Sequence, residues 1–337
     1  MFRANQERSG EYTGRGPSAL TGVKWRFKAG GQVHSSPAVS GGKVYCGSSN
    51  GHIYALDEQE GALIWKSNTS GVNRSSPAIS GGMVYCGSSD GHIYALDAGT
   101  GRERWRFETG DEVTSSPAVS GGMVYCGSSD GHVYALDAET GRERWRFETG
   151  GSVTSSPAIY EGTVYCGSLD MHIYAVDADT GRERWRFETG HWVGSSPAVS
   201  GGMVYCGSSD GYVYALDAVT GRERWRFETG DEVTSSPAVS GGMVYCGSWD
   251  RFIYAVDADT GRERWRYETW GEVLSSPAVS GGMVYCGSSD GHVYALDAET
   301  GGERWRFEEG CFLYSSPVVS GGAVFTGSPA GYLYALE

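Results

Sequence analysis

Serine, aspartate and histidine stand together in one short turn, as in Ser129-Asp130-Gly131-His132. These are the residue types of nucleophilic hydrolysis, in which a carboxylate orients a histidine that takes the serine proton. The turn recurs almost unchanged at forty-residue steps, and further histidines fill the same position at His52, His92, His172 and His292. An active site needs one such set, so the repetition favours a structural role. We expect no catalytic residue in this chain.

The cysteines are of a type that could form disulfides or hold a metal ion. Seven of the eight occupy equivalent positions in successive copies: Cys46, Cys86, Cys126, Cys166, Cys206, Cys246 and Cys286. A repeat array keeps equivalent atoms apart, and the chain lacks the C-x-x-C and H-x-x-H spacings of a standard zinc site. We predict buried free thiols and no metal site, with Cys311 outside the series. A ring formed by the turn histidines is the metal-binding alternative.

Composition and charge limit the partners. The chain has 337 residues, 39% of them hydrophobic, and a formal net charge of -14. Nucleic acid and anionic membrane surfaces require clustered Lys and Arg, so neither is expected as a partner. No apolar run reaches the roughly 18 residues of a membrane span, and residues 1–20 lack the apolar stretch of a secretory signal. These features predict a soluble, cytoplasmic protein.

The elements that position these residues belong to a tandem repeat. Tryptophans recur every forty residues without an insertion, at Trp25, Trp65, Trp105, Trp145, Trp185, Trp225, Trp265 and Trp305. A period of this length, with no helical spacing inside it, indicates a propeller or another repeat array. Several ordinary domains would not produce it.

Each copy predicts four short strands. In the third copy they span residues 115–120, 123–128, 132–137 and 142–149. The Gly-Gly and Asp-Gly pairs between them are hairpin signals, so the strands form an antiparallel meander. Pro117 lies in the first strand, which a propeller places beside its central channel, where a missing N–H is tolerated.

The chain ends predict a closed ring. Residues 22–30 form a fourth strand without the first three, and the last copy has three strands without a fourth. Pairing the two parts removes a free sheet edge. The predicted fold is all-β: a single closed eight-bladed propeller over residues 22–337, with four antiparallel strands per blade and the N-terminal strand closing the last. Residues 1–21 are expected to be a flexible leader or linker. The blades lie at about 35–70, 75–110, 115–150, 155–190, 195–230, 235–270, 275–310 and 315–337.

One segment resembles a known family motif. The run from Ala135 to Trp145, ALDAETGRERW, is similar to the tryptophan-docking motif A-x-D-x-x-T-G-x-x-x-W of PQQ-like quinoprotein propellers. The resemblance covers nearly the whole chain and implies that the tryptophans of the repeat dock successive blades. The family includes alcohol and sugar dehydrogenases that bind pyrroloquinoline quinone and calcium. Those enzymes carry adjacent cysteines and long insertions that this chain lacks, so we expect no cofactor and no enzyme activity.

The copies differ mainly in two stretches: the residues before each Ser-Ser-Pro, and the turn between the second and third strands. Strand direction places both stretches on one rim of the ring. The substitutions there are mostly large, and many are aromatic. The predicted binding residues are Leu169, Met171, His191, Trp192, Tyr212, Trp249, Arg251, Phe252, Trp270, Leu274, Cys311, Phe312, Tyr314 and Tyr332.

Exposed Trp, Tyr and Arg supply most interface hot spots, so this rim predicts a recognition surface. We expect a monomeric ring that binds a protein or peptide, with a glycan as the alternative ligand. Highly repetitive propellers of this family also resemble sensor parts of larger bacterial signalling or conflict proteins. The competing interpretation is a recently amplified or engineered scaffold without a specific ligand, whose loops have simply drifted.

Overall fold

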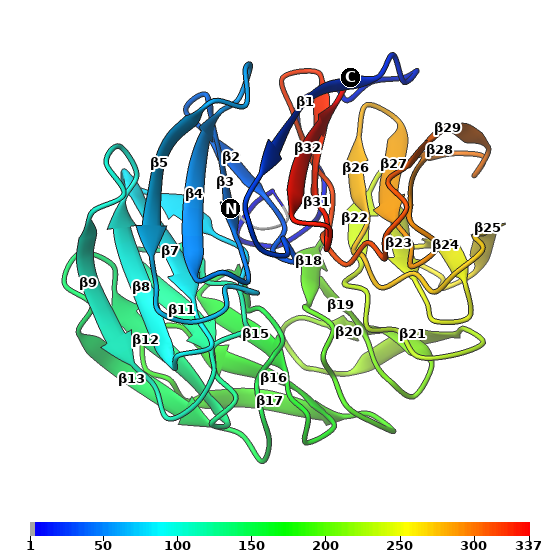
Figure 1. The fold of residues 1–337 in the computed structure, drawn as a ribbon. Helices are drawn as coiled ribbons and strands as arrows, with labels where there is room; N and C mark the ends of the chain where they lie inside the picture. The colour runs from blue at the N-terminus through cyan, green and yellow to red at the C-terminus, as the bar shows by residue number, and fades with distance from the viewer. Residues whose placement is uncertain (1–3) are drawn as a thin grey trace.

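The computed structural model describes residues 4–337, which fold into eight four-stranded antiparallel sheets arranged around one axis (Figure 1). Within seven of the sheets the strands follow one another in chain order, because short turns join antiparallel neighbours, and the eighth combines β30–β32 with β1. No helix occurs within this described part of the chain. The all-β eight-bladed propeller expected from the repeats is therefore confirmed.

Blades 1 to 7 each consist of four consecutive strands, numbered outward from the axis. The bounds for blades 1 to 4 are β2 Ala38–Ser40, β3 Lys43–Gly47, β4 His52–Asp57, β5 Leu63–Asn68; β6 Ala78–Ser80, β7 Met83–Gly87, β8 His92–Asp97, β9 Glu103–Glu108; β10 Ala118–Ser120, β11 Met123–Gly127, β12 His132–Asp137, β13 Glu143–Glu148; β14 Ala158–Tyr160, β15 Thr163–Gly167, β16 His172–Asp177 and β17 Glu183–Glu188. Those for blades 5 to 7 are β18 Ala198–Ser200, β19 Met203–Gly207, β20 Tyr212–Asp217, β21 Glu223–Glu228; β22 Ala238–Ser240, β23 Met243–Gly247, β24 Phe252–Asp257, β25 Glu263–Glu268; β26 Ala278–Ser280, β27 Met283–Gly287, β28 His292–Asp297 and β29 Glu303–Glu308.

Blade 8 joins the two ends of the chain. Its inner three strands are β30 Val318–Ser320, β31 Ala323–Gly327 and β32 Tyr332–Leu336, and its outer strand is β1 Val23–Lys28. Strands β1 and β32 pair antiparallel, with Trp25 opposite Ala335. The ring is thus closed by the N-terminal strand, as the sequence predicts.

The innermost strands are shorter than expected. Strand β10 begins at Ala118, not at Ser115, because the Ser-Ser-Pro residues before it bond to other parts of the ring. The second serine of each motif donates its backbone N–H to the Oγ of the equivalent serine in the next blade, at 2.9–3.0 Å. These bonds form one closed circle around the axis, through Ser36, Ser76, Ser116, Ser156, Ser196, Ser236, Ser276 and Ser316.

The repeated tryptophans connect each blade to the next. Trp145 of blade 3 is buried, and its indole N–H donates to Ala178 O of blade 4 at 2.9 Å. Gly181 (φ 69°) lies against the same ring, and a Cβ there would stand 2.7 Å from it. This contact explains the glycine of the Thr-Gly pair, since only glycine fits both the conformation and the space. The docking role of the tryptophan series is confirmed.

The core lies between neighbouring blades. One hydrophobic cluster joins Val133 and Trp145 of blade 3 to Cys166 and Tyr174 of blade 4, and equivalent clusters recur around the ring. The seven cysteines of the repeat are buried and free, as predicted. Burial raises the pKa of the Cys126 thiol to about 12, so it stays a neutral apolar group.

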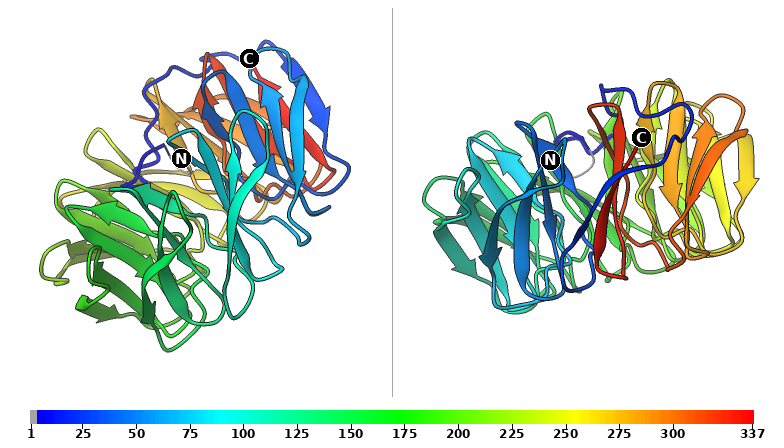
Figure 2. Two further views of the ribbon diagram at one scale, coloured as in Figure 1. Left: turned by 90° about the vertical axis from the view of Figure 1, so that its left-hand side faces the viewer. Right: turned by 45° about the horizontal axis from the view of Figure 1, so that its top comes forward.

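The N-terminal segment differs from the flexible leader that its polar composition suggests. Residues 1–3 of that leader lie outside the described residues, whereas residues 4–21 lie against the ring from the axis to blade 8 (Figure 2). Pro17 O accepts the indole N–H of Trp305 at 2.9 Å. The other seven tryptophans of the repeat donate instead to a carbonyl of the next blade, 33 residues further along the chain. The segment thus completes the docking of blade 7.

The docking tryptophans should be far more important for stability than the rim aromatics. Trp145→Ala removes a buried ring and its hydrogen bond, so we expect a loss of about 3–5 kcal/mol in the free energy of unfolding. Trp192→Ala, on the exposed rim, should change it by less than about 0.5 kcal/mol. Urea unfolding followed by tryptophan fluorescence and circular dichroism measures both. Equal losses would contradict the assignment of the two classes.

Candidate functional site

The two variable stretches lie side by side. Each link between blades, such as residues 190–194, bonds to the turn between the second and third strands of the following blade. Ser209 N donates to Trp192 O at 2.9 Å, and Gly190 N donates to Asp210 Oδ2 at 2.7 Å. We call this face the variable rim; the face with the Gly-Gly and Thr-Gly turns is the opposite rim.

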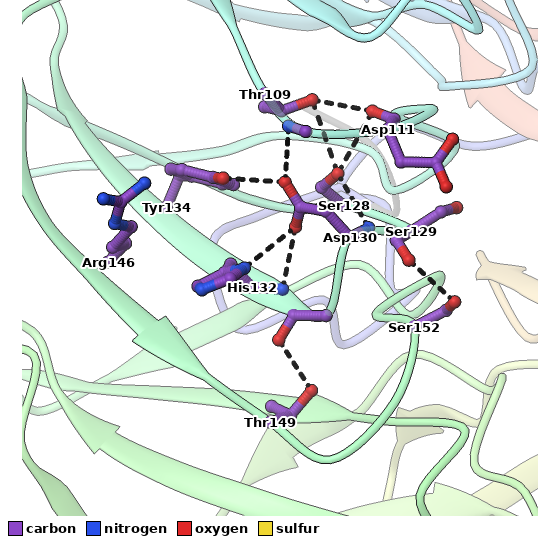
Figure 3. Close-up of polar contacts among 12 residues, drawn as sticks. Thr109, Asp111, Ser128, Ser129, Asp130, His132, Tyr134, Arg146, Thr149 and Ser152 are labelled. Carbon is purple, nitrogen blue, oxygen red and sulfur yellow. Dashed lines mark hydrogen bonds and ion pairs between the residues drawn. The ribbon is translucent and has the colours of Figure 1, made fainter.

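The repeated aspartate of the turn holds this rim together, as Figure 3 shows for blade 3. Asp130 Oδ2 accepts from Gly110 N at 2.6 Å and from the Tyr134 hydroxyl at 2.7 Å. Its Oδ1 accepts from His132 N at 3.0 Å and lies 3.2 Å from His132 Nδ1. Ser129 N donates to Glu112 O at 2.9 Å, and Ser129 O accepts from Ser152 Oγ at 2.9 Å. The serine, aspartate and histidine of the motif therefore serve to attach link and turn.

The electrostatics of this cluster fit a structural role. Burial raises the pKa of Asp130, but hydrogen bonds from Tyr134, Gly110 and His132 outweigh it and hold that pKa below its ordinary value. Burial and the bond to Asp130 raise the pKa of Tyr134 to about 12. Near neutral pH the aspartate is ionised and the tyrosine neutral, which is the pairing that the short bond requires.

Four of the predicted binding residues are large, exposed aromatics. The exposed fractions are 51% for Trp192, 65% for Trp270, 60% for Phe312 and 44% for Tyr314. They occupy three of the four consecutive links 190–194, 230–234, 270–274 and 310–314, so they extend over one half of the rim. His191, Met171 and Arg251 are also exposed on this face.

The other predicted residues pack onto the rim. Trp249, which we expected to be exposed, is partly buried, and its indole N–H donates to Thr234 Oγ1 at 2.8 Å. Leu169, Leu274 and Cys311 are also partly buried. Three aromatics that replace the turn histidine lie beneath arginines of the outer strands, at 5.1–5.4 Å: Tyr212 with Arg226, Phe252 with Arg266, and Tyr332 with Arg26.

Two exposed residues have an unfavourable backbone conformation. Met171 (φ 72°) and Arg251 (φ 76°) stand where most blades have a glycine, such as Gly131 (φ 87°). A side chain in this left-handed region costs roughly 1–2 kcal/mol. The turn keeps its shape because neighbouring bonds fix it: Thr189 N donates to Met171 O, and Thr269 N to Arg251 O, both at 2.8 Å.

Two residues that the sequence reasoning missed lie at the axial end of the rim. His34, Arg74 and Tyr314 line a cavity of about 370 Å³. The rings of His34 and Tyr314 are 5.6 Å apart. Burial and the charge of Arg74 lower the pKa of the His34 imidazole. The sequence did distinguish His34 and Arg74, because the same position is a threonine in three other links: Thr114, Thr154 and Thr234.

Within residues 4–337, no group of three or more His, Cys, Asp or Glu side chains is placed to hold a metal ion. The same residues contain no helix that is long and apolar enough to cross a membrane.

Solved structures share this architecture. BamB from Moraxella catarrhalis is 23% identical, with a TM-score of 0.83 over 95% of this chain and 100% of its own. A europium-containing methanol dehydrogenase is 17% identical, with a TM-score of 0.85 over 100% and 97%. The computationally designed Ika8 protein is 21% identical, with a TM-score of 0.81 over 96% and 99%. At these identities the likeness shows the fold alone.

Sequence comparison adds the family. No curated protein sequence gives a significant match. The profile described as "Outer membrane protein assembly factor BamB", a PQQ-type repeat, matches residues 19–128, 49–168, 89–211, 130–234, 169–269 and 209–337. These overlapping matches cover every blade. The chain therefore belongs to the BamB-type family of PQQ-repeat propellers.

Proposed function

We propose that this propeller is a non-catalytic binding module that recognises a protein or peptide through the aromatic half of its variable rim. The main support is the position of four exposed aromatic residues on this rim: Trp192, Trp270, Phe312 and Tyr314. In the described chain, every large aromatic that is well exposed lies on this one rim. Opposite them, the exposed apolar residues are aliphatic, as at Val219.

Physical chemistry supports a protein or peptide as the partner. Trp and Tyr bury large areas on binding and lose few rotamers, so they are efficient anchors. The links that carry them are fixed by backbone bonds to the next blade, which lowers the entropy lost on association. The aromatics extend over several blades, which suits the roughly 800 Å² footprint of a protein better than a small molecule.

Backbone strain is a second feature of the variable rim. Glycine adopts this φ without cost, whereas a larger side chain is retained at a cost in stability, as it is at Glu161 on the opposite rim. Met171 and Arg251 keep the strained conformation and expose their side chains on the aromatic half of the rim. Strain that persists in this way is a pointer to function.

The family fold also carries dehydrogenases, so the non-catalytic assignment rests on this chain's residues. Where the turn has Ser, Asp and His, as in blade 3, these residues are bonded within the rim, as Asp130 is. The turns are short, with only four residues, Ser128–Gly131, between β11 and β12, and they build no enclosure that would exclude water from a reaction.

Reverting the exposed aromatics should abolish binding. The change Trp192→Glu, Trp270→Gly, Phe312→Glu and Tyr314→Thr restores the residue common at each position. Two or more hot spots of about 2 kcal/mol each predict a loss in affinity of at least about 100-fold. A partner captured from cell lysate by the wild-type ring, then purified, would be titrated calorimetrically against both rings. Val219→Asp on the opposite rim is the control. Equal affinities of the wild-type and reverted rings would reject the proposed face.

Relieving the strain should separate stability from binding. Arg251→Gly is expected to raise the free energy of unfolding by about 1 kcal/mol, because glycine accepts the φ of 76° without strain. Glu161→Gly is the matched control: its φ is 46° and it lies on the opposite rim. Both variants should gain stability in urea unfolding, and Arg251→Gly alone should weaken the partner. If Arg251→Gly binds the partner as tightly as the wild-type ring does, Arg251 is not part of the binding site.

A further inference from the structure

An arginine closes the ring axis from the opposite rim. Arg8 has no exposed surface. Its Nη2 donates to Ser116 O at 2.8 Å and to Pro117 O at 3.1 Å, and its Nε donates to Pro157 O. These carbonyls precede the innermost strands of blades 3 and 4. A buried charge is tolerated only when its hydrogen bonds are satisfied, and the planar fork of a guanidinium can reach several carbonyls at once.

The backbone around Arg8 follows the inner strands. The carbonyls of Gln6, Glu7, Ser9 and Gly10 accept N–H bonds of 2.7–2.8 Å from successive blades, with the donors Ile159, Val199, Val239 and Val279. The innermost strand of a blade has a free edge, which can pair with an extended chain. The repeat places the same edge in every blade, so the axis offers a curved row of donors.

The segment that occupies this row is not an ideal fit. Arg8 itself has φ 53°, in the left-handed region that an arginine rarely adopts. Its guanidinium bonds hold it there. A peptide that presents an arginine to the same carbonyls without this strain would make the same bonds at a lower conformational cost.

We propose that the axial opening on the opposite rim is a binding site for an extended peptide that carries an arginine, and that residues 6–10 of this chain occupy it internally. The peptide backbone would accept from the inner-strand N–H groups, and the guanidinium would fill the carbonyl pocket formed by Ser116, Pro117 and Pro157. The site is separate from the aromatic rim and does not depend on the function proposed for that rim.

The test uses the full chain with Arg8→Ala, which empties the pocket without removing Pro17. The probe is a fluorescent peptide with the sequence of residues 4–13, ANQERSGEYT. Fluorescence anisotropy should show at least 10-fold tighter binding to Arg8→Ala than to the wild-type chain, where the site is filled. A probe with lysine in place of its arginine has the same charge and should bind at least 10-fold more weakly, since lysine has one nitrogen, whereas Arg8 donates from both Nε and Nη2.

A second measurement uses the wild-type chain. It tests the proposal if circular dichroism shows that Arg8→Ala does not fold. A roughly 100-fold excess of unlabelled probe should displace the internal segment and speed hydrogen exchange in residues 4–12, whereas the lysine probe should not. Equal binding of the arginine and lysine probes would reduce the effect to charge attraction toward an acidic protein. No binding to Arg8→Ala, or no change in exchange, would make residues 6–10 a fixed structural plug and overturn the proposal.

Discussion

The structure depends on buried hydrogen-bond donors in each blade whose acceptors lie in the next blade. Trp145 has a bonding partner for its indole N–H in Ala178 of the following blade, and Ser116 N finds its acceptor in Ser156. A buried donor without a partner would destabilise the fold by roughly 1–3 kcal/mol, so no blade is stable by itself. The array must therefore close. Strand β1 pairs with β32 of blade 8, and Pro17 O accepts the indole N–H of Trp305 in blade 7.

The docking groups are separate from the exposed link side chains, which explains why the variable rim can differ from blade to blade. Docking uses the tryptophan, the Thr-Gly turn and the Ser-Ser-Pro motif, and the turn aspartate holds link to turn through backbone N–H groups, as Asp210 holds Gly190. Apart from a buried core residue such as Val193, the side chains of link 190–194 lie toward the surface. They can be exchanged for exposed aromatics such as Trp192 or Trp270 at little cost to the fold, and a rigid array of different links becomes a binding surface.

The opposite rim serves closure instead. The N-terminal segment lies there, supplies a carbonyl to Trp305 and fills the axis with Arg8. Its polar, glycine-containing sequence looks like that of a linker, although the segment is bound to the ring. The reason is that its bonds to the ring are made mostly by backbone carbonyls. Such contacts leave no pattern of apolar residues in the sequence.

The sequence alone determined the period, the four-strand blade, the closing strand and the docking tryptophans, because these follow from local turn chemistry repeated at a fixed spacing. It also placed the variable stretches on one rim, since strands alternate in direction. Only the tertiary structure decided which rim residues are exposed: Trp249 packs on Thr234 of the neighbouring link, while Trp270 projects into solvent. It likewise decided that His34 and Arg74 meet Tyr314. Both outcomes depend on contacts between different blades, which bring together residues that spacing within one copy cannot relate.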